Sequence, residues 1–232
     1  MNISKCCKYS WMSYYPVKPS KKKSIKTIYD RNEINTDKCA KILYIKENDS
    51  TYIAFRGTKN KGDIREALKV VPIETINGLV HSGFYGKYLD FKDELEAMLK
   101  DDESENIYFT GHSMGGCLAL ISSVSSFNLL GDILNNKNIY CYMFGSPVVV
   151  NRMFLDNAEI VLKSLISIEL ESDIIPQIPL NPVFKRPSNV LSIKDSNNII
   201  NVMKNHSCMA YYKSILKREI NDVIKGNTMI CP

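Results

Sequence analysis

Histidine and tryptophan are scarce in this chain, and metal-binding patterns are missing from it. Its 232 residues include 3 histidines, 1 tryptophan and 7 cysteines. The cysteines show neither a Cys-x-x-Cys nor a combined Cys/His spacing, which argues against a zinc site. The first residues contain no apolar signal-peptide core, and no apolar run reaches the length expected of a membrane span. These absences lead us to expect a cytoplasmic protein in a reducing compartment.

A strong charge imbalance is also missing. The chain has 30 Lys and Arg against 25 Asp and Glu, a net charge of +5. Part of the excess lies in the run Lys21-Lys22-Lys23, which is typical of a solvated loop and is also a candidate for peripheral contact with anionic lipid headgroups. No basic stripe is interleaved with aromatic residues, so nucleic acid is not an expected partner. No pattern in the chain predicts an oligomeric state.

Apolar, β-branched runs alternate with helical patterns along the chain. A content of 44% hydrophobic and 24% charged residues is typical of a globular domain. Strand-like runs lie at 39–45, 51–55, 107–110, 139–144, 165–170 and 190–193, and helical patterns at 88–100, from 118 onward and at 209–224. This alternation predicts an α/β fold with a mostly parallel central sheet flanked by helices.

The start of the chain carries two further features. The first two strand-like runs are joined by the turn-forming sequence Glu47-Asn48-Asp49-Ser50, which predicts an N-terminal β-hairpin. Residues 1–35 are basic and aromatic and contain prolines, so we expect an irregular arm that docks on the core through its aromatic side chains, or contacts lipid. The proline-rich stretch 176–187 is too short for a linker, and we predict one domain over residues 1–232.

One strand-like run leads directly into Gly111-His112-Ser113-Met114-Gly115, a G-x-S-x-G pattern. The apolar run 118–121 follows it, so a strand passes into a helix through a very tight turn. Glycines on either side let the backbone crowd without a Cβ clash. Ser113 would then stand on the bend, above a helix N-terminus that offers free N–H groups to a developing oxyanion. We interpret this stretch as a nucleophile elbow.

A serine hydroxyl needs a general base within hydrogen-bond reach. In α/β-hydrolases the nucleophile, the acid and the histidine follow in that order along the chain, and His206 is the only histidine after Ser113. His206 is therefore the predicted base, against the alternative of a surface histidine before a helix. His112 occupies a variable elbow position and is expected to point away from Ser113. His81 is interpreted as a structural hydrogen-bonding residue or as a cleft wall.

The acid that orients the base must lie between these two residues, near the end of a strand. Asp173 follows an apolar strand-like run and precedes Ile174-Ile175-Pro176, which would hold its loop. It is the preferred candidate, and its role would be to hold the imidazole tautomer while remaining ionised. Glu171 and Asp195 are the competing candidates, and Asp195 also follows a strand-like run.

An oxyanion hole needs two converging donors. One is the backbone N–H after the nucleophile, which is that of Met114. The other is expected in a loop after an early strand, and Arg56-Gly57-Thr58 is the candidate, because Gly57 permits the turn and Thr58 offers both its N–H and its hydroxyl.

These motifs occur in an order seen in a known family. They are Ala54-Phe55-Arg56-Gly57-Thr58, His81-Ser82-Gly83-Phe84, Thr110–Gly116, Phe144-Gly145-Ser146-Pro147, Asp173-Ile174-Ile175-Pro176 and His206. Over residues 35–215 the chain resembles the class 3, fungal-type triacylglycerol lipases. By resemblance, Ser113, Asp173 and His206 match the family triad, and Thr58 with Met114 match its oxyanion pair. The resemblance implies an α/β-hydrolase fold and a serine hydrolase of lipid acyl esters at an interface, needing no metal or organic cofactor.

The chain departs from the family pattern in two places. Members often carry an Asp/Asn-Trp pair after the Arg-Gly-Thr strand, whereas Asp63-Ile64 stands here. That segment forms the interfacial lid of the fungal lipases, so residues 59–78 are either a lid or a fixed flap packed on the core. Secreted fungal members also have signal peptides and disulfides, and this chain shows neither signature.

Three alternatives to a triacylglycerol lipase therefore stay open. The chain could be a phospholipase, a mono- and diacylglycerol lipase, or a non-catalytic lipase-like binding protein. Asn205-His206-Ser207 forms an N-glycosylation sequon around the predicted base, where a glycan would obstruct the site, which again favours a reducing interior.

Overall fold

The computed structural model describes residues 2–16, 24–29, 41–58, 71–195 and 202–224 of the chain. In chain order its elements are α1 (Ile3–Met12), β1 (Ser24–Tyr29), β2 (Lys41–Glu47), β3 (Ser50–Phe55), β4 (Pro72–Thr75), β5 (Gly78–His81), α3 (Ser82–Lys100), β6 (Asn106–His112), α4 (Met114–Leu134), β7 (Asn138–Phe144), α5 (Arg152–Val161), β8 (Ser164–Leu170), η1 (Ile175–Gln177), β9 (Val190–Ile193), α6 (Val202–Asn205) and α7 (Cys208–Ile224).

A seven-stranded sheet in the order β1-β2-β3-β6-β7-β8-β9 forms the centre of the molecule. β1, β2 and β3 pair antiparallel, whereas β3, β6, β7, β8 and β9 pair parallel. The predicted N-terminal hairpin and the mostly parallel α/β architecture are confirmed. Because parallel strands bring their carboxyl ends to one edge of a sheet, the loops after β3, β6, β7 and β8 gather there.

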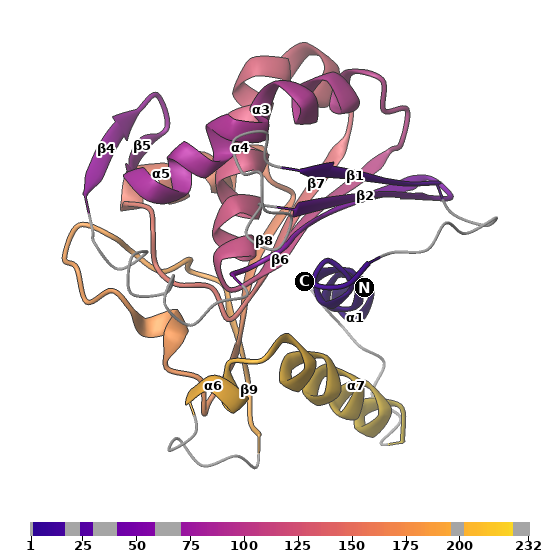
Figure 1. Cartoon of the computed structure of the whole chain (residues 1–232), viewed down its shortest axis with the longest axis vertical. Coiled ribbons are helices and arrows are strands. Elements are labelled where there is room, and N and C mark those ends of the chain that lie inside the picture. The colour runs from indigo at the N-terminus through magenta and orange to yellow at the C-terminus, as the bar shows by residue number, and fades with distance from the viewer. Residues whose placement is uncertain (1, 17–23, 30–40, 59–70, 196–201, 225–232) are drawn as a thin grey trace.

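Helices cover both faces of this sheet (Figure 1). α3, α4 and α5 pack on one face, and α1 and α7 pack on the other. Alternate residues of a strand enter the two cores, so that Phe109 on β6 joins the first and its neighbour Tyr108 the second. Burial on both faces explains why the parallel strands are almost continuously apolar.

α4 runs through the middle of the first core. By length and composition it would suffice to cross a membrane, and 67% of its apolar window is buried inside the protein. This corrects the expectation that no apolar run reaches that length. Contact with β6, β7 and α3 accounts for the composition, because a helix enclosed by protein is apolar all round.

The N-terminal segment is not the irregular arm predicted for residues 1–35, since α1 and β1 form within it. The lysine run 21–23 lies outside the described residues. α1 packs on the sheet and on α7: Ser10 Oγ lies 3.1 Å from Thr110 Oγ1 on β6, and the rings of Trp11 and Tyr212 stack 6.2 Å apart. The pattern was missed because this short helix depends on tertiary contacts more than on propensity. The predicted docking through aromatic side chains is confirmed.

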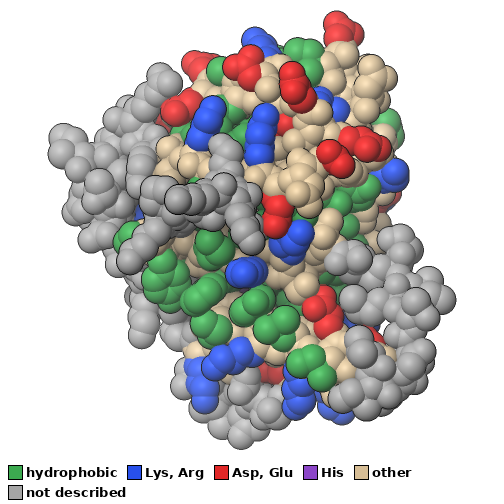
Figure 2. Space-filling view, turned by 90° about the vertical axis from the view of Figure 1, so that its right-hand side faces the viewer, with side chains coloured by type: hydrophobic (Ala, Val, Ile, Leu, Met, Phe, Trp, Pro, Cys, Tyr) green, Lys and Arg blue, Asp and Glu red, His purple; other side chains and the backbone are tan. Residues whose placement is uncertain are grey.

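The surface on the side of the molecule where α1 and α7 lie is partly apolar. Figure 2 shows hydrophobic side chains gathered at its lower centre, with Lys and Arg side chains beside and below them. Tyr15, just after α1, is 52% exposed, and Ile220 on α7 is 58% exposed. α1, the residues after it and α7 therefore bury one side against the sheet and leave apolar groups on the other.

The structure differs from the sequence-based expectation at two other helices, α3 and α5. α3 begins at Ser82, earlier than expected, because the His81 ring accepts a hydrogen bond from the Gly83 N–H at 3.1 Å and caps the helix. This contact confirms the structural interpretation of His81. Of the predicted lid or flap, residues 59–70 lie outside the described chain, so that choice stays a prediction. α5 had no counterpart in the sequence analysis.

The packing of α1 generates a stability test at Tyr9, which is 1% exposed and donates a hydrogen bond to Glu47 at 2.8 Å. We expect Tyr9→Ala to lower the free energy of unfolding by about 3 kcal/mol, because it opens a cavity between α1 and the sheet. Tyr9→Phe removes only the hydroxyl and should cost about 1 kcal/mol. Urea unfolding measures both, with the exposed Lys8→Ala as the control. Equal stability of Tyr9→Ala and Lys8→Ala would contradict the docking of α1.

Candidate active site

The turn between β6 and α4 holds Ser113 in an unusual backbone conformation. Its φ is 58° and its ψ is −129°, in a region that residues with a side chain avoid. The Ser113 N–H donates to the Phe144 carbonyl on β7 at 2.9 Å, and the Ser113 carbonyl accepts from the Gly116 N–H at 3.0 Å. These bonds over-determine the turn, and the predicted elbow is confirmed.

Glycines allow this turn to pack against its neighbours. A Cβ atom added to Gly115 would lie 2.1 Å from the Phe55 carbonyl oxygen at the end of β3. One added to Gly111 would lie 2.2 Å from the backbone of Gly115. Only glycine fits at these two positions. The close approach also brings the loop after β3 beside Ser113.

His206 lies between α6 and α7, with its ring facing Ser113. The distance from His206 Nε2 to Ser113 Oγ is 2.8 Å. The two residues are 5% and 7% exposed, respectively, so the contact is largely shielded from solvent. The predicted approach of His206 to Ser113 is confirmed, and the alternative of a surface histidine is wrong.

Asp173 completes this chain of contacts. Its Oδ2 lies 2.8 Å from His206 Nδ1, and its Oδ1 accepts a hydrogen bond from the Ile175 N–H at 3.0 Å. The competing acids lie elsewhere: Glu171 is exposed, and Asp195 accepts the Ser172 hydroxyl at 2.6 Å. The structure therefore selects Asp173 as the partner of His206.

Tyr211 on α7 is a member of the site that the sequence analysis missed. Its hydroxyl donates to Asp173 Oδ2 at 2.7 Å and accepts from the Leu170 N–H at 3.3 Å. Burial raises the pKa of this hydroxyl well above its usual value, and the adjacent Asp173 raises it further, so the group keeps its proton. Gly145 leaves room for the contact, because its φ is +59° and an added Cβ would lie 2.8 Å from the Tyr211 oxygen. Nothing in the sequence separates Tyr211 from the other 12 of the 13 tyrosines.

The predicted oxyanion pair lies on adjoining segments. Met114 is the first residue of α4, where a backbone N–H has no partner within the helix. The Thr58 hydroxyl donates to Met114 Sδ at 3.4 Å. A Cβ added to Gly57 would lie 3.3 Å from Ser113 Cβ, which shows how closely the loop 56–58 approaches the nucleophile candidate. The structure therefore brings Thr58 and Met114 to the same side of the elbow.

His112 is more closely engaged with the site than the sequence suggested. Its ring centroid lies 4.7 Å from that of His206, with the planes tilted by 36°. Its Nδ1 lies 2.9 Å from the Tyr14 hydroxyl. Burial lowers the pKa of His112 well below the ordinary histidine value, and the neighbouring His206 lowers it further. His112 is therefore a neutral ring that supports the site.

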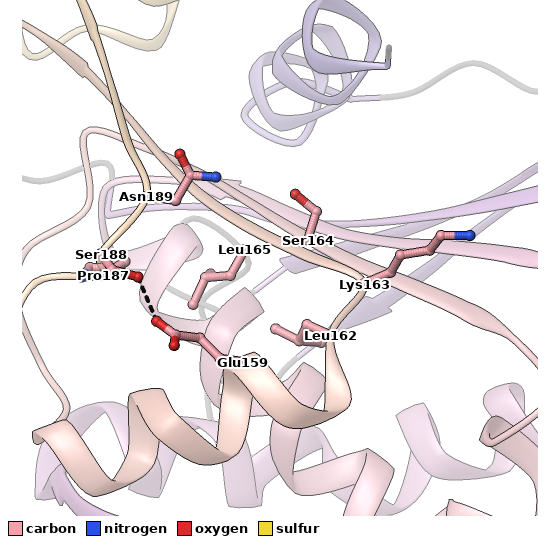
Figure 3. Close-up of a pocket in the computed structure, with 8 residues that line it drawn as sticks. All are labelled: Glu159, Leu162, Lys163, Ser164, Leu165, Pro187, Ser188 and Asn189. Carbon is pink, nitrogen blue, oxygen red and sulfur yellow. Dashed lines mark hydrogen bonds between the residues drawn. The ribbon is translucent and has the colours of Figure 1, made fainter. Parts of the chain in front are cut away.

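A separate cavity of about 260 Å³ opens near the start of β8 (Figure 3). It is lined by Glu159, Leu162, Lys163, Ser164, Leu165, Pro187, Ser188 and Asn189. Asp173 follows the other end of β8, so the cavity and the triad lie at opposite edges of the sheet. Among the residues that the structure describes, no group of three or more His, Cys, Asp or Glu side chains is placed to hold a metal ion.

Comparison with known proteins finds lipases. Residues 52–183 match the family model of the class 3 lipases. A lipase of Rhizomucor miehei is 30% identical over 138 residues, which cover 55% of this chain and 37% of that protein. The secreted mono- and diacylglycerol lipase 3 of Gibberella zeae is 21% identical over 170 residues, or 67% of this chain and 53% of that protein. The chain thus spans less than two thirds of the length of either relative.

Solved lipase structures share the architecture. The triacylglyceride lipase of Rhizomucor miehei superposes with a TM-score of 0.65 at 22% identity, covering 76% of this chain and 68% of that one. The LIP2 lipase of Yarrowia lipolytica gives a TM-score of 0.67 at 18% identity, covering 88% and 91%. These likenesses show the α/β-hydrolase fold. The match of residues 52–183, more than half of the chain, to the family model shows that the chain belongs to the class 3 lipase family.

Proposed function

We propose that this chain is a serine hydrolase that cleaves lipid acyl esters. The observation that carries the proposal is the continuous contact from Ser113 through His206 to Asp173, with 2.8 Å at each step. Three polar groups from distant segments meet here in a largely buried place. Such an arrangement activates a hydroxyl, and fold stability alone gives no reason for it.

In this mechanism His206 Nε2 accepts the Ser113 proton as Ser113 Oγ attacks the ester carbonyl carbon. The imidazolium that forms is stabilised by the Asp173 carboxylate at Nδ1. The Tyr211 hydroxyl and the Ile175 N–H hold that carboxylate in place from two sides. His206 therefore needs little reorganisation between its neutral and charged states.

The tetrahedral oxyanion forms next to the start of α4. The Met114 N–H and the Thr58 N–H or hydroxyl are the proposed donors, and the positive end of the α4 dipole adds to them. His206 then gives its proton to the departing alkoxide, which leaves as the alcohol. The acyl group stays bound to Ser113 Oγ as an ester. Water activated by His206 hydrolyses this acyl-enzyme and releases the fatty acid.

Two exposed apolar side chains in the segment that follows Asp173 support the approach of a lipid surface. Ile174 is 38% exposed and Leu180 is 91% exposed, both in the loop region after β8. Exposed apolar side chains near a reactive centre suit a substrate that stays in an aggregated lipid phase. The similar proteins named above are a lipase and a mono- and diacylglycerol lipase, which favours glycerol esters as the substrate class.

We also propose that the protein works in a reducing compartment such as the cytoplasm. The described cysteines, Cys6, Cys7, Cys117, Cys141 and Cys208, carry free thiols. Asn205 of the sequon is 1% exposed and donates to the Ser172 carbonyl at 3.2 Å, so a glycan there would disrupt the loop that holds His206. Both features suit a chain that does not meet the oxidising and glycosylating conditions of secretion.

The proposal predicts that Ser113 is activated. Ser113→Ala should reduce p-nitrophenyl ester hydrolysis by on the order of 10⁴-fold or more, because the nucleophile is lost. It should also abolish covalent labelling by a fluorophosphonate, with an unchanged circular dichroism spectrum. The exposed Ser188→Ala is the control and should label like the parent chain. A folded parent chain that fails to label would favour a non-catalytic binding protein.

The proposed acid is tested separately. Asp173→Asn should lower kcat by on the order of 10³- to 10⁴-fold, because the amide favours the wrong imidazole tautomer. The two former competitors provide matched controls in the same kinetic assay. Glu171→Gln should leave kcat within about twofold and Asp195→Asn within about tenfold, since neither carboxylate contacts His206. A larger loss in Asp195→Asn than in Asp173→Asn would contradict the assignment.

A substrate panel decides between the remaining activities. Tri-, di- and monoacylglycerols and phosphatidylcholine are presented at increasing interfacial area, and fatty acid release is measured. We expect acylglycerol hydrolysis to exceed phospholipid hydrolysis at least about tenfold, because the similar proteins named above are a lipase and a mono- and diacylglycerol lipase. Preferential release from phosphatidylcholine would instead identify a phospholipase.

A further inference from the structure

Tyr14 lies just after α1, and its hydroxyl lies between the loop 56–58 and His112, the last residue of β6. The Tyr14 oxygen is 2.9 Å from Nδ1 of His112, the residue before the serine, and the two rings meet edge to face with centroids 5.9 Å apart. No motif in the sequence joins these residues, which are 98 positions apart.

The same hydroxyl contacts the loop after β3. A Cβ added to Gly57 would lie 2.2 Å from the Tyr14 oxygen, so this glycine leaves the space that the hydroxyl occupies. Burial raises the pKa of Tyr14 well above its usual value, while a hydrogen bond from the Gly57 backbone and the charge of Arg56 act in the opposite direction. The Tyr14 hydroxyl therefore keeps its proton and receives the Gly57 N–H.

The donor and acceptor roles follow from this arrangement. An oxygen that accepts the Gly57 N–H still has its own O–H to donate, and the neutral His112 ring offers an unprotonated nitrogen. His112 then accepts at Nδ1 and carries its proton on Nε2. Its ring centroid lies 4.7 Å from that of the His206 ring, and the two planes are tilted by 36°.

We propose that Tyr14 is a positioning residue that ties the loop 56–58 to His112 and thereby sets the place of the His206 ring. The proposal rests on the proposed hydrolase function, since it assigns Tyr14 a role in that same site. It also gives α1 a functional role, because the docking of α1 on the sheet places Tyr14 between the loop 56–58 and the end of β6.

Several ionisable groups face this contact and bear on its pH dependence. His112 contacts Tyr14 on the N-terminal segment, His206 before α7 and Tyr211 on α7. Arg56 and Cys208 lie near Tyr14, and Asp173 lies behind His206. A charge on His112 would oppose the imidazolium that His206 forms in catalysis. Keeping His112 neutral with a single tautomer therefore preserves the base.

The first test reads the tautomer directly. With only 3 histidines in the chain, ¹⁵N-labelled imidazoles can be resolved by NMR and assigned through His81→Gln and His112→Asn. We expect His112 in the parent chain to stay neutral with the proton on Nε2 between about pH 5.5 and pH 8. Tyr14→Phe should shift the His112 Nδ1 resonance toward that of a nitrogen without a hydrogen bond. A proton on Nδ1 in the parent chain, or an unchanged resonance in Tyr14→Phe, overturns the proposal.

The second test is kinetic and uses the neighbouring tyrosine as the control. Tyr14→Phe keeps the ring and should lower kcat about fivefold to tenfold with KM within about twofold, the scale of one lost hydrogen bond. The pH profile of kcat should shift at its acid limb. Tyr15→Phe, at an exposed ring, should leave both constants unchanged. An unaltered kcat and pH profile in Tyr14→Phe overturns the proposal.

The two tests separate failure of this inference from failure of the proposed function. If Tyr14→Phe does not fold, the parent spectrum alone decides, through the tautomer of His112. If the parent chain neither hydrolyses esters nor reacts with a fluorophosphonate, the hydrolase assignment fails, and with it the role of Tyr14. If the parent chain is active but the His112 Nδ1 resonance and kcat are unchanged in Tyr14→Phe, only the positioning role fails.

Discussion

The hydrogen-bonded chain from Ser113 through His206 to Asp173 depends on how closely three backbone segments can approach one another. The elbow serine leaves β6, the acid leaves β8, and the histidine enters from the loop before α7. A parallel sheet supplies the common edge, because its strands release their loops on the same side. The glycines at 111, 115 and 145 then remove the Cβ atoms that would hold these segments apart.

Burial shields the hydrogen bonds among Ser113, His206 and Asp173 from water. Ser113, His206 and Asp173 are all at most 7% exposed, so water does not compete strongly for their hydrogen bonds. The same burial makes unpaired polar atoms costly, and neighbouring groups supply partners for several of them. Tyr211 and the Ile175 N–H complete Asp173, while Tyr14 engages His112. The site is therefore a small, largely buried polar network at the carboxyl ends of the parallel strands.

The N-terminal segment belongs to this network. α1 covers the second face of the sheet together with α7. Tyr14, just after α1, and Tyr211 on α7 enter the site from opposite ends of the chain. Tyr211 arrives five residues after His206, whereas Tyr14 arrives from nearly 200 residues upstream. Stability of the second core and alignment of the site are thus linked through the same two helices.

Local sequence predicted the elements of the site that depend on short-range chemistry. The strand-to-helix transition at Gly111–Gly115 requires glycine at its two ends, and that requirement is visible in the chain itself. His206 followed because no other histidine comes after Ser113. The hairpin, the parallel sheet and the final helix were visible in apolar periodicity. α1 was not, because its few turns form only against the sheet.

What the sequence by itself determined is the elbow, the base and the order of the motifs, since these depend on residue type and chain order. The sequence already favoured Asp173, but only the tertiary structure excluded Glu171 and Asp195 and showed the parts played by Tyr211 and Tyr14. Each of those depends on which side chain reaches a shared point across the fold. The sequence gives the type of a residue, such as Asp or Tyr, but not the direction of its side chain. Only packing brings one such side chain within hydrogen-bond distance of the imidazole or its partners.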